Sequence, residues 1–245
     1  MIEVRDLNYS VKKSGKSFSI NNINFKLEDG YIMSLLGKNG SGKTTLLSLI
    51  YGALSPNSGE VVWNGKKINI DNRYDFRNDV AYIGDMDWCF GTKSINENVK
   101  MLKLLYKNFD ETIFEEYIEY FDLNDVEREK DYADLSTGKM MQFQIAFALA
   151  RKPKLLLMDE PMANLDPVIK VDLMEMLQQK VMQENMSIII STHLVEDISD
   201  MTDYIGILDD GNMKEFGDRE KIFEKYEVED LRKLLLHIRK NSEWR

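Results

Sequence analysis

The sequence is short of several features that would place it in particular protein classes. Cys89 is its only cysteine, so no disulfide can form within the chain, and a reducing, cytosolic compartment is expected. It has no run of about 18 uncharged apolar residues, so no segment is expected to span a membrane. The opening Met-Ile-Glu-Val-Arg-Asp lacks the basic start and apolar run of a signal peptide. Internal repeats, low-complexity tracts and Pro/Gly-rich linkers are not found either.

Positive charge is also scarce. The 245 residues include 32 Lys+Arg against 42 Asp+Glu, which gives a formal net charge of -10 at pH 7. This balance argues against a protein that mainly wraps nucleic acid, so no nucleic-acid partner is expected. The length allows one substantial core, or a core with a smaller lobe attached.

The apolar pattern predicts an α/β core. Residues 2–9 and 18–27 alternate apolar and polar side chains as half-buried strands do, whereas residues 31–36 are apolar on both faces, as in a central strand. Further strand-like runs lie at 60–63, 80–83, 155–158, 187–190 and 204–208, and helix-length stretches at 43–51, 139–150 and 167–184. This alternation predicts a mainly parallel sheet with an N-terminal antiparallel β part.

Residues 92–130 have a different pattern, rich in Glu, Tyr, Asn and Lys at helical spacing with no strand signal. We interpret them as part of a helical subdomain, about residues 88–150, inserted into an α/β domain that covers residues 1–220. Residues 221–245 carry apolar side chains spaced as in one or two amphipathic helices, which predicts a C-terminal helical tail.

The segment Gly37-Lys-Asn-Gly-Ser-Gly-Lys-Thr-Thr45 satisfies the P-loop pattern, with an apolar strand before it and a helix after it. Glycines let backbone N–H groups curl around phosphate oxygens, Lys43 supplies a charge to the β and γ phosphates, and the Thr44 hydroxyl can bind Mg²⁺. The expected nucleotide-binding residues are Gly37, Asn39, Gly40, Ser41, Gly42, Lys43, Thr44 and Thr45.

Two acids follow a second apolar run in Lys154-Leu-Leu-Leu-Met-Asp-Glu-Pro161. At the carboxyl end of a strand they would lie where open α/β sheets bind ligands. Asp159 is expected to hold Mg²⁺ through water, and Glu160 to accept a proton from the water that attacks the γ-phosphate. Alone, such a pair is more often a solvated turn, but the P-loop in the same chain favours the catalytic interpretation.

A second anion site is predicted at Asp134-Leu-Ser-Thr-Gly-Lys139, which precedes a helix. The Ser136 hydroxyl, the Gly138 N–H and the positive end of the helix would form it. Because the P-loop already serves this chain's own nucleotide, we interpret the second site as serving the nucleotide of another molecule.

In this order the motifs resemble the ATP-binding cassette family, the nucleotide-binding subunits of ABC transporters, over about residues 2–220. Leu135–Lys139, here called the signature turn, is similar to the family's Leu-Ser-Gly-Gly-Gln, Ala163–Asp166 to its D-loop, and Ser191–His193 to its switch histidine. The resemblance implies two cassettes packed head to tail, identical or different, with each ATP buried between one P-loop and the other signature turn. A separate transmembrane permease subunit would hold the pair at the cytoplasmic face of the cell membrane.

The resemblance also assigns roles to single residues. Glu160 would be the general base, with His193 hydrogen-bonded to the γ-phosphate. Asp166 would lie at the dimer seam, although an aspartate before a proline could simply cap a helix. Asp85 stands where the family usually has a glutamine, and its carboxylate is expected to shift that position toward binding the metal. Tyr9 is an expected adenine contact, with core packing as the alternative, because Val11 occupies the best-aligned position.

The signature turn departs from the family pattern at two positions. Thr137 replaces the first glycine and Lys139 replaces the glutamine. Because Ser136 and Gly138 remain, nucleotide sandwiching is expected to survive, with the turnover rate left open.

The expected function is therefore ATP hydrolysis that drives transport through a separate membrane subunit. Export is the expected direction, because the short C-terminus and the acidic residue at position 85 resemble bacterial exporters of peptides, lipids or drugs. Two alternatives are a soluble ABC ATPase of translation or DNA repair, and an ATP-dependent switch that dimerises without efficient turnover.

Overall fold

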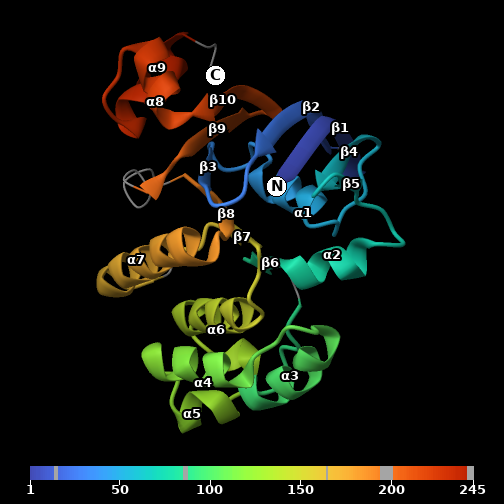
Figure 1. Cartoon of the computed structure of the whole chain (residues 1–245), viewed down its shortest axis with the longest axis vertical. Helices are drawn as coiled ribbons and strands as arrows, with labels where there is room; N and C mark the ends of the chain where they lie inside the picture. The colour runs from blue at the N-terminus through green and yellow to red at the C-terminus, as the bar shows by residue number, and fades with distance from the viewer. Residues whose placement is uncertain (14–15, 85–87, 164, 194–200, 242–245) are drawn as a thin grey trace.

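The computed structural model describes residues 1–13, 16–84, 88–163, 165–193 and 201–241 (Figure 1). Within these residues ten strands form one sheet, in the order β5-β4-β1-β2-β10-β9-β3-β8-β7-β6. An antiparallel half and a mainly parallel half therefore meet in the middle of the sheet, as the sequence pattern predicted.

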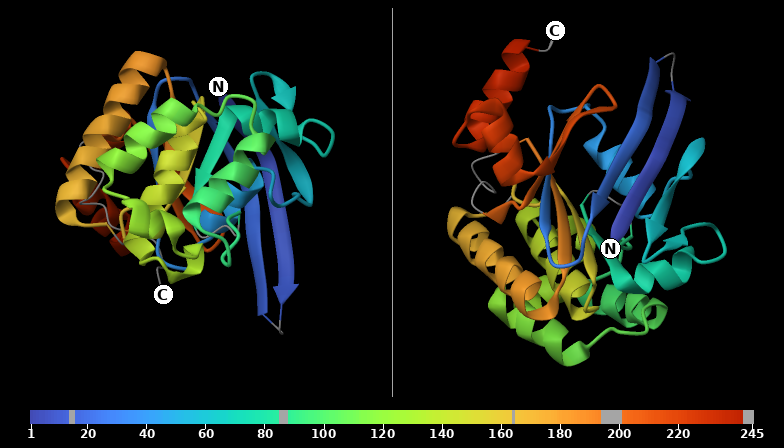
Figure 2. Two further views of the ribbon diagram at one scale, coloured as in Figure 1. Left: turned by 90° about the horizontal axis from the view of Figure 1, so that it is seen from below. Right: turned by 45° about the horizontal axis from the view of Figure 1, so that its top comes forward.

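The antiparallel half consists of β1 (Ile2–Lys13), β2 (Lys16–Leu27), β4 (Ser58–Trp63) and β5 (Lys66–Lys67). β1 pairs antiparallel with β2 on one side and with β4 on the other. Figure 2 shows the long β1–β2 hairpin standing out from the rest of the chain. Its register places Val11 opposite Phe18 and Tyr9 opposite Ile20.

The parallel half contains β3 (Ile32–Leu36), β6 (Val80–Ile83), β7 (Leu155–Asp159), β8 (Ser187–Thr192) and β9 (Tyr204–Asp209). β3 pairs parallel with β8 and β9, and β7 pairs parallel with β6 and β8. Every residue of β3, β6, β7 and β8 is buried. Burial on both faces explains why these strands are continuous apolar runs in the sequence.

β10 (Asn212–Asp218) was not predicted. It pairs antiparallel with β9 and touches β2 through the parallel pair of Asn212 and Asn21. Most of its residues are half-buried rather than alternating between the core and solvent. The sequence signal for a strand is correspondingly weak.

The helices around the parallel half are α1 (Lys43–Ile50), α2 (Arg73–Asp79) and α7 (Pro167–Glu184). The bounds of α7 agree with the sequence prediction. The Asp166 carboxylate accepts a hydrogen bond from the Val168 N–H at 2.9 Å, so Asp166 does cap α7. The short helix α2 was missed because Phe76 is its one buried residue, which leaves no apolar face to detect.

A group of helices from the middle of the sequence, green and yellow in Figure 1, lies at one end of the molecule. They are α3 (Ile95–Leu102), η1 (Lys103–Leu105), α4 (Glu111–Tyr120), α5 (Asp125–Glu129), η2 (Tyr132–Asp134) and α6 (Thr137–Ala150). The prediction of a strand-free, helical segment after residue 92 is confirmed in its secondary structure. Every residue of α6 from 141 to 150 is buried, so this helix is the core of the group.

The C-terminal part forms α8 (Arg219–Tyr226) and α9 (Leu231–Asn241), as predicted. Leu231, Leu234 and Ile238 are buried in the same cluster as Ile222. This packing places the tail against its own chain, at the opposite end from α3, α4 and α5 (Figure 1). Among the helices of the described residues, none has both the length and the apolar character needed to cross a bilayer.

Candidate functional site

The P-loop joins β3 to α1 and borders a cavity of about 280 Å³. The described residues that line the cavity are Phe18, Asn39, Gly40, Gly42, Lys43, Thr44, Thr45 and Glu160. Gly42, the N-cap of α1, has φ 110°, and a Cβ there would lie 2.7 Å from Ile20 Cδ1 and 2.9 Å from Phe18 Cζ. Only glycine fits this position. Because Gly42 has no side chain, an anion can come close to the loop and to the unpaired N–H groups at the start of α1.

Lys43 is buried beside this cavity. Its ammonium group donates to the Gly37 carbonyl at 2.7 Å and forms an ion pair with Glu160 Oε1 at 3.1 Å. Ser41 Oγ is also buried, and within the described residues it has no hydrogen-bond partner. A buried cation and an unsatisfied hydroxyl fit a bound phosphate, whose oxygens accept hydrogen bonds from both.

The two acids predicted from the sequence lie where β7 ends. Asp159 accepts hydrogen bonds from the Ser191 hydroxyl and, at 3.3 Å, from the Tyr82 hydroxyl. The next residue, Glu160, has φ 50°, and its N–H donates to the Ser191 carbonyl at 3.0 Å. A left-handed backbone costs a non-glycine residue about 1 kcal/mol or more, so the surrounding bonds hold Glu160 in a strained position.

His193 follows β8 and reaches the same carboxylate. Its Nδ1 lies 2.8 Å from Glu160 Oε2, and its N–H donates to that oxygen at 3.3 Å. Glu160 therefore bridges Lys43 and His193, which come from the P-loop and from a strand end far along the chain. The structure brings the three predicted catalytic residues together.

Oxygen donors for a metal are present at the same place. Thr44 borders the cavity, and Asp159 is bonded to the partners named above, whereas Asp85 lies outside the described residues. Within the described residues no group of three or more His, Cys, Asp or Glu side chains could hold a metal alone. Mg²⁺ is usually bound by one or two protein oxygens together with phosphates and water, so the hydroxyl and carboxylate fit Mg²⁺ that arrives with a nucleotide.

The signature turn lies at the start of α6, as predicted. Ser136 is the N-cap, and its hydroxyl accepts a hydrogen bond from the Lys139 N–H at 3.3 Å. The Lys139 ammonium group donates to the carbonyls of Asp122, at 2.8 Å, and Phe121, at 3.3 Å, at the end of α4. Residues 136–139 do not line the P-loop cavity. The charge introduced by Lys139 is thus engaged within the helical group, and the turn is a separate site from the P-loop.

Phe18 is a site residue that the sequence analysis missed. It lines the P-loop cavity from β2, whereas Tyr9 packs against the core that includes Ile20. The hairpin register gives the missing signal, because Phe18 is paired with Val11, the position best aligned with the family's adenine-binding aromatic. The expected adenine contact of Tyr9 stays a prediction, and its packing matches the alternative stated above.

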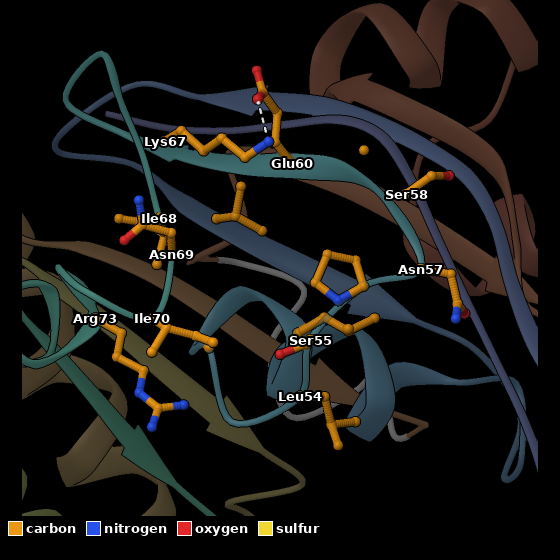
Figure 3. Close-up of a pocket in the computed structure, with 15 residues that line it drawn as sticks. Leu54, Ser55, Asn57, Ser58, Glu60, Lys67, Ile68, Asn69, Ile70 and Arg73 are labelled. Atoms are coloured by element: carbon orange, nitrogen blue, oxygen red, sulfur yellow. Dashed lines mark ion pairs between the residues drawn. The ribbon is translucent and has the colours of Figure 1, made fainter.

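A larger hollow lies away from this chemistry. It has a volume of about 470 Å³ and lies between β4, β5 and the end of α1 (Figure 3). Glu60 and Lys67 on its rim form an ion pair at 3.2 Å. None of the predicted nucleotide-binding or catalytic residues lines it, so its size alone does not make it the functional site.

Comparison with known proteins agrees with the geometry. A family model described as ABC transporter matches residues 20–163. The chain is 30% identical over 226 residues to the ABC transporter ATP-binding protein YtrB of Bacillus subtilis (strain 168), covering 92% of this chain and 75% of YtrB. It is 27% identical over 229 residues to the lantibiotic transport ATP-binding protein SrtF of Streptococcus pyogenes, covering 92% of this chain and 96% of SrtF.

A solved structure shares the fold. It is the dimeric structure of a post-hydrolysis state of the ATP-binding cassette MJ0796 bound to ADP and Pi, with a TM-score of 0.79 and 22% identity, covering 89% of this chain and 98% of that chain. The family match covers more than half of the chain, and the alignment with YtrB covers 92% of it. The chain therefore belongs to the ABC transporter family, as one of its ATP-binding, ATP-hydrolysing subunits.

Proposed function

We propose that Lys43, Glu160 and His193 carry out ATP hydrolysis in this subunit, and that the energy drives a separate permease. The observation that carries the proposal is the position of Glu160, whose two carboxylate oxygens lie 3.1 Å from Lys43 Nζ and 2.8 Å from His193 Nδ1. A carboxylate beside a phosphate-binding lysine can accept a proton from water only after the lysine has taken a phosphate instead.

The proposed sequence of events follows from this arrangement. The γ-phosphate of ATP replaces Glu160 as the partner of Lys43, with the P-loop N–H groups and the Ser41 hydroxyl completing its binding. Glu160 remains oriented by His193 and accepts the proton of the attacking water. Mg²⁺, held through Thr44 and Asp159, would neutralise charge on the phosphates.

The signature turn implies a second subunit. Ser136 caps the start of α6, and residues 136–139 do not line the P-loop cavity of the same chain. We therefore propose that the turn completes the ATP site of a second cassette in a head-to-tail pair, either another copy of this chain or a different one.

The permease would hold this pair at the cytoplasmic face of the membrane. Export remains a prediction from the sequence, because the name of SrtF gives lantibiotic transport without a direction. The alternative of a switch without efficient turnover makes a different prediction for the activity of the purified subunit.

Glu160→Gln tests the proposal because it keeps the side-chain size and removes the base. We expect ATPase activity to fall by about 10²-fold or more, while light scattering shows a monomer without ATP and a dimer with ATP and Mg²⁺. Lys43→Ala is the matched control, which should lose both ATP binding and dimerisation. Equal and negligible activity in the wild type and in Glu160→Gln would support the switch. A monomer in both conditions, with ATP bound, would overturn pairing between identical copies.

A further inference from the structure

A buried glutamine lies in the middle of the apolar helix α6. Gln144 is 8% exposed and lies among residues 141–150, all of which are buried. Both ends of its amide are bonded: Oε1 accepts from the Gly84 N–H at 2.9 Å, and Nε2 donates to the Tyr132 hydroxyl at 2.9 Å. A buried amide that loses a partner is destabilised, so this one holds its two partners at a fixed separation.

The first partner lies behind the nucleotide site. Gly84 follows β6 with φ 148°, and a Cβ there would lie 2.8 Å from Asp159 Cβ. Tyr82, two residues earlier, donates its hydroxyl to Asp159 at 3.3 Å. Gly84 therefore packs directly against Asp159, the acid at the end of β7 that precedes Glu160 and is expected to hold Mg²⁺.

The second partner leads into the signature turn. Tyr132 begins η2, its N–H donates to the Lys93 carbonyl at 2.8 Å, and its carbonyl accepts from the Leu135 N–H at 3.2 Å. Its ring packs on Phe143 with centroids 5.7 Å apart. Its side chain also hydrogen-bonds Cys89, whose pKa is raised by burial. Tyr132 thus fixes the segment that ends at Ser136.

We propose that Gln144 is a positioning residue that links the two ATP sites of a cassette pair. It ties the Gly84 peptide, which packs on Asp159 of the chain's own site, to the Tyr132 hydroxyl, which supports the turn offered to the other subunit's ATP. Occupation of one site thereby sets the geometry of the other. This inference rests on the head-to-tail pair of the proposed function.

Substitution of Gln144 by Met tests the link, because Met has a similar length and removes both hydrogen bonds. Gln142→Met is the matched control: Gln142 is another buried glutamine of α6, and its Oε1 has no hydrogen-bond partner within the described residues. Tyr132→Phe is a second test variant, which removes the hydroxyl that accepts from Gln144 Nε2 and that also bonds Cys89.

We expect ATP binding to the monomeric Gln144→Met subunit to stay unchanged. In the Glu160→Gln background, the ATP concentration needed for half-dimerisation should rise by about tenfold, within the usual range of coupling between sites. In the otherwise wild-type chain, the Hill coefficient of ATPase activity should fall toward 1. Tyr132→Phe should act in the same direction, and the double variant should show less than the sum of the two effects.

The experiment distinguishes failure of the proposed cassette pair from failure of the Gln144 link. If the Glu160→Gln parent itself does not dimerise with ATP, the proposed pair fails and the link fails with it. If the parent dimerises, but Gln144→Met and Tyr132→Phe change the dimerisation midpoint and Hill coefficient no more than Gln142→Met does, the link alone is overturned.

Discussion

Glu160 Oε2 lies 2.8 Å from His193 Nδ1 and also accepts the His193 backbone N–H at 3.3 Å. Two contacts from one residue fix both the position and the rotation of the carboxylate. His193 therefore orients the proposed base.

His193→Ala should lower kcat by about 10²-fold, because a misplaced base loses much of its effect, while KM for ATP changes much less. Steady-state ATPase kinetics measure both. The chain's other histidine provides the control: His237 lies on α9 against Tyr226, and His237→Ala should keep the wild-type kcat. A normal kcat in His193→Ala would remove this residue from the proposed mechanism.

Phe18→Ala should weaken ATP binding by about 10- to 100-fold, the range expected when an aromatic ring that stacks on a base is removed. At saturating ATP, kcat should be nearly unchanged, because Phe18 is expected to contact the base and not the phosphate that reacts. Fluorescence or calorimetric titration gives the Kd. Phe18→Tyr keeps a ring and should bind normally. Tyr9→Phe should also bind normally, and loss of ATP affinity in that variant would instead favour Tyr9 as the adenine contact.

Lys139→Met should loosen the signature turn, because it removes the two donated hydrogen bonds at the end of α4. A cation at a helix C-terminus contributes up to about 1 kcal/mol, so the urea midpoint should fall by a corresponding small amount. ATP-dependent dimerisation in the Glu160→Gln background should weaken more clearly.

Lys139→Arg keeps the charge and should restore most of the dimerisation. Lys107→Met is the control for losing a lysine on the surface, since Lys107 pairs with Asp75 in full contact with solvent. If Lys139→Met dimerises as the chain with Lys139 does, the contact with α4 does not position the turn.

Arg151→Met should destabilise the fold by about 3 kcal/mol, the cost of leaving buried polar partners unpaired. The Arg151 side chain is buried, donates to the carbonyls of Arg77 and Val80, and lies over the Tyr106 ring at 3.5 Å from its centroid. Urea unfolding followed by circular dichroism measures the loss. Arg151→Lys should rescue little, because a lysine has no planar fork to serve these partners together. Arg5→Met, at an exposed surface pair, should leave the midpoint unchanged.

The sequence predicted the elements whose burial is uniform or whose ends carry strong signals. β3 and β7 are continuous apolar runs because both faces are covered, and α7 begins at an Asp-Pro cap that the sequence displays. Lys43 and Glu160 could be assigned because their motifs carry their own structural context.

Other parts of the site depend on contacts between distant segments. Phe18 enters the cavity only because the β1–β2 register places it beside Val11. Likewise, nothing local to α6 shows that Lys139 reaches the end of α4, or that Gln144 joins Gly84 to Tyr132. Such contacts are set by tertiary packing, which periodicity and local motifs do not encode.

The ion pair of Lys43 and Glu160 gives the lysine a counter-ion beside the P-loop cavity. An incoming triphosphate therefore replaces a carboxylate as the partner of Lys43. Its affinity should depend less on salt concentration than the number of charges suggests. Carboxylate and phosphate exclude each other from the same nitrogen. Release of the Glu160 carboxylate from Lys43 would thus accompany ATP binding. After hydrolysis, the same carboxylate would compete with the product phosphate for Lys43.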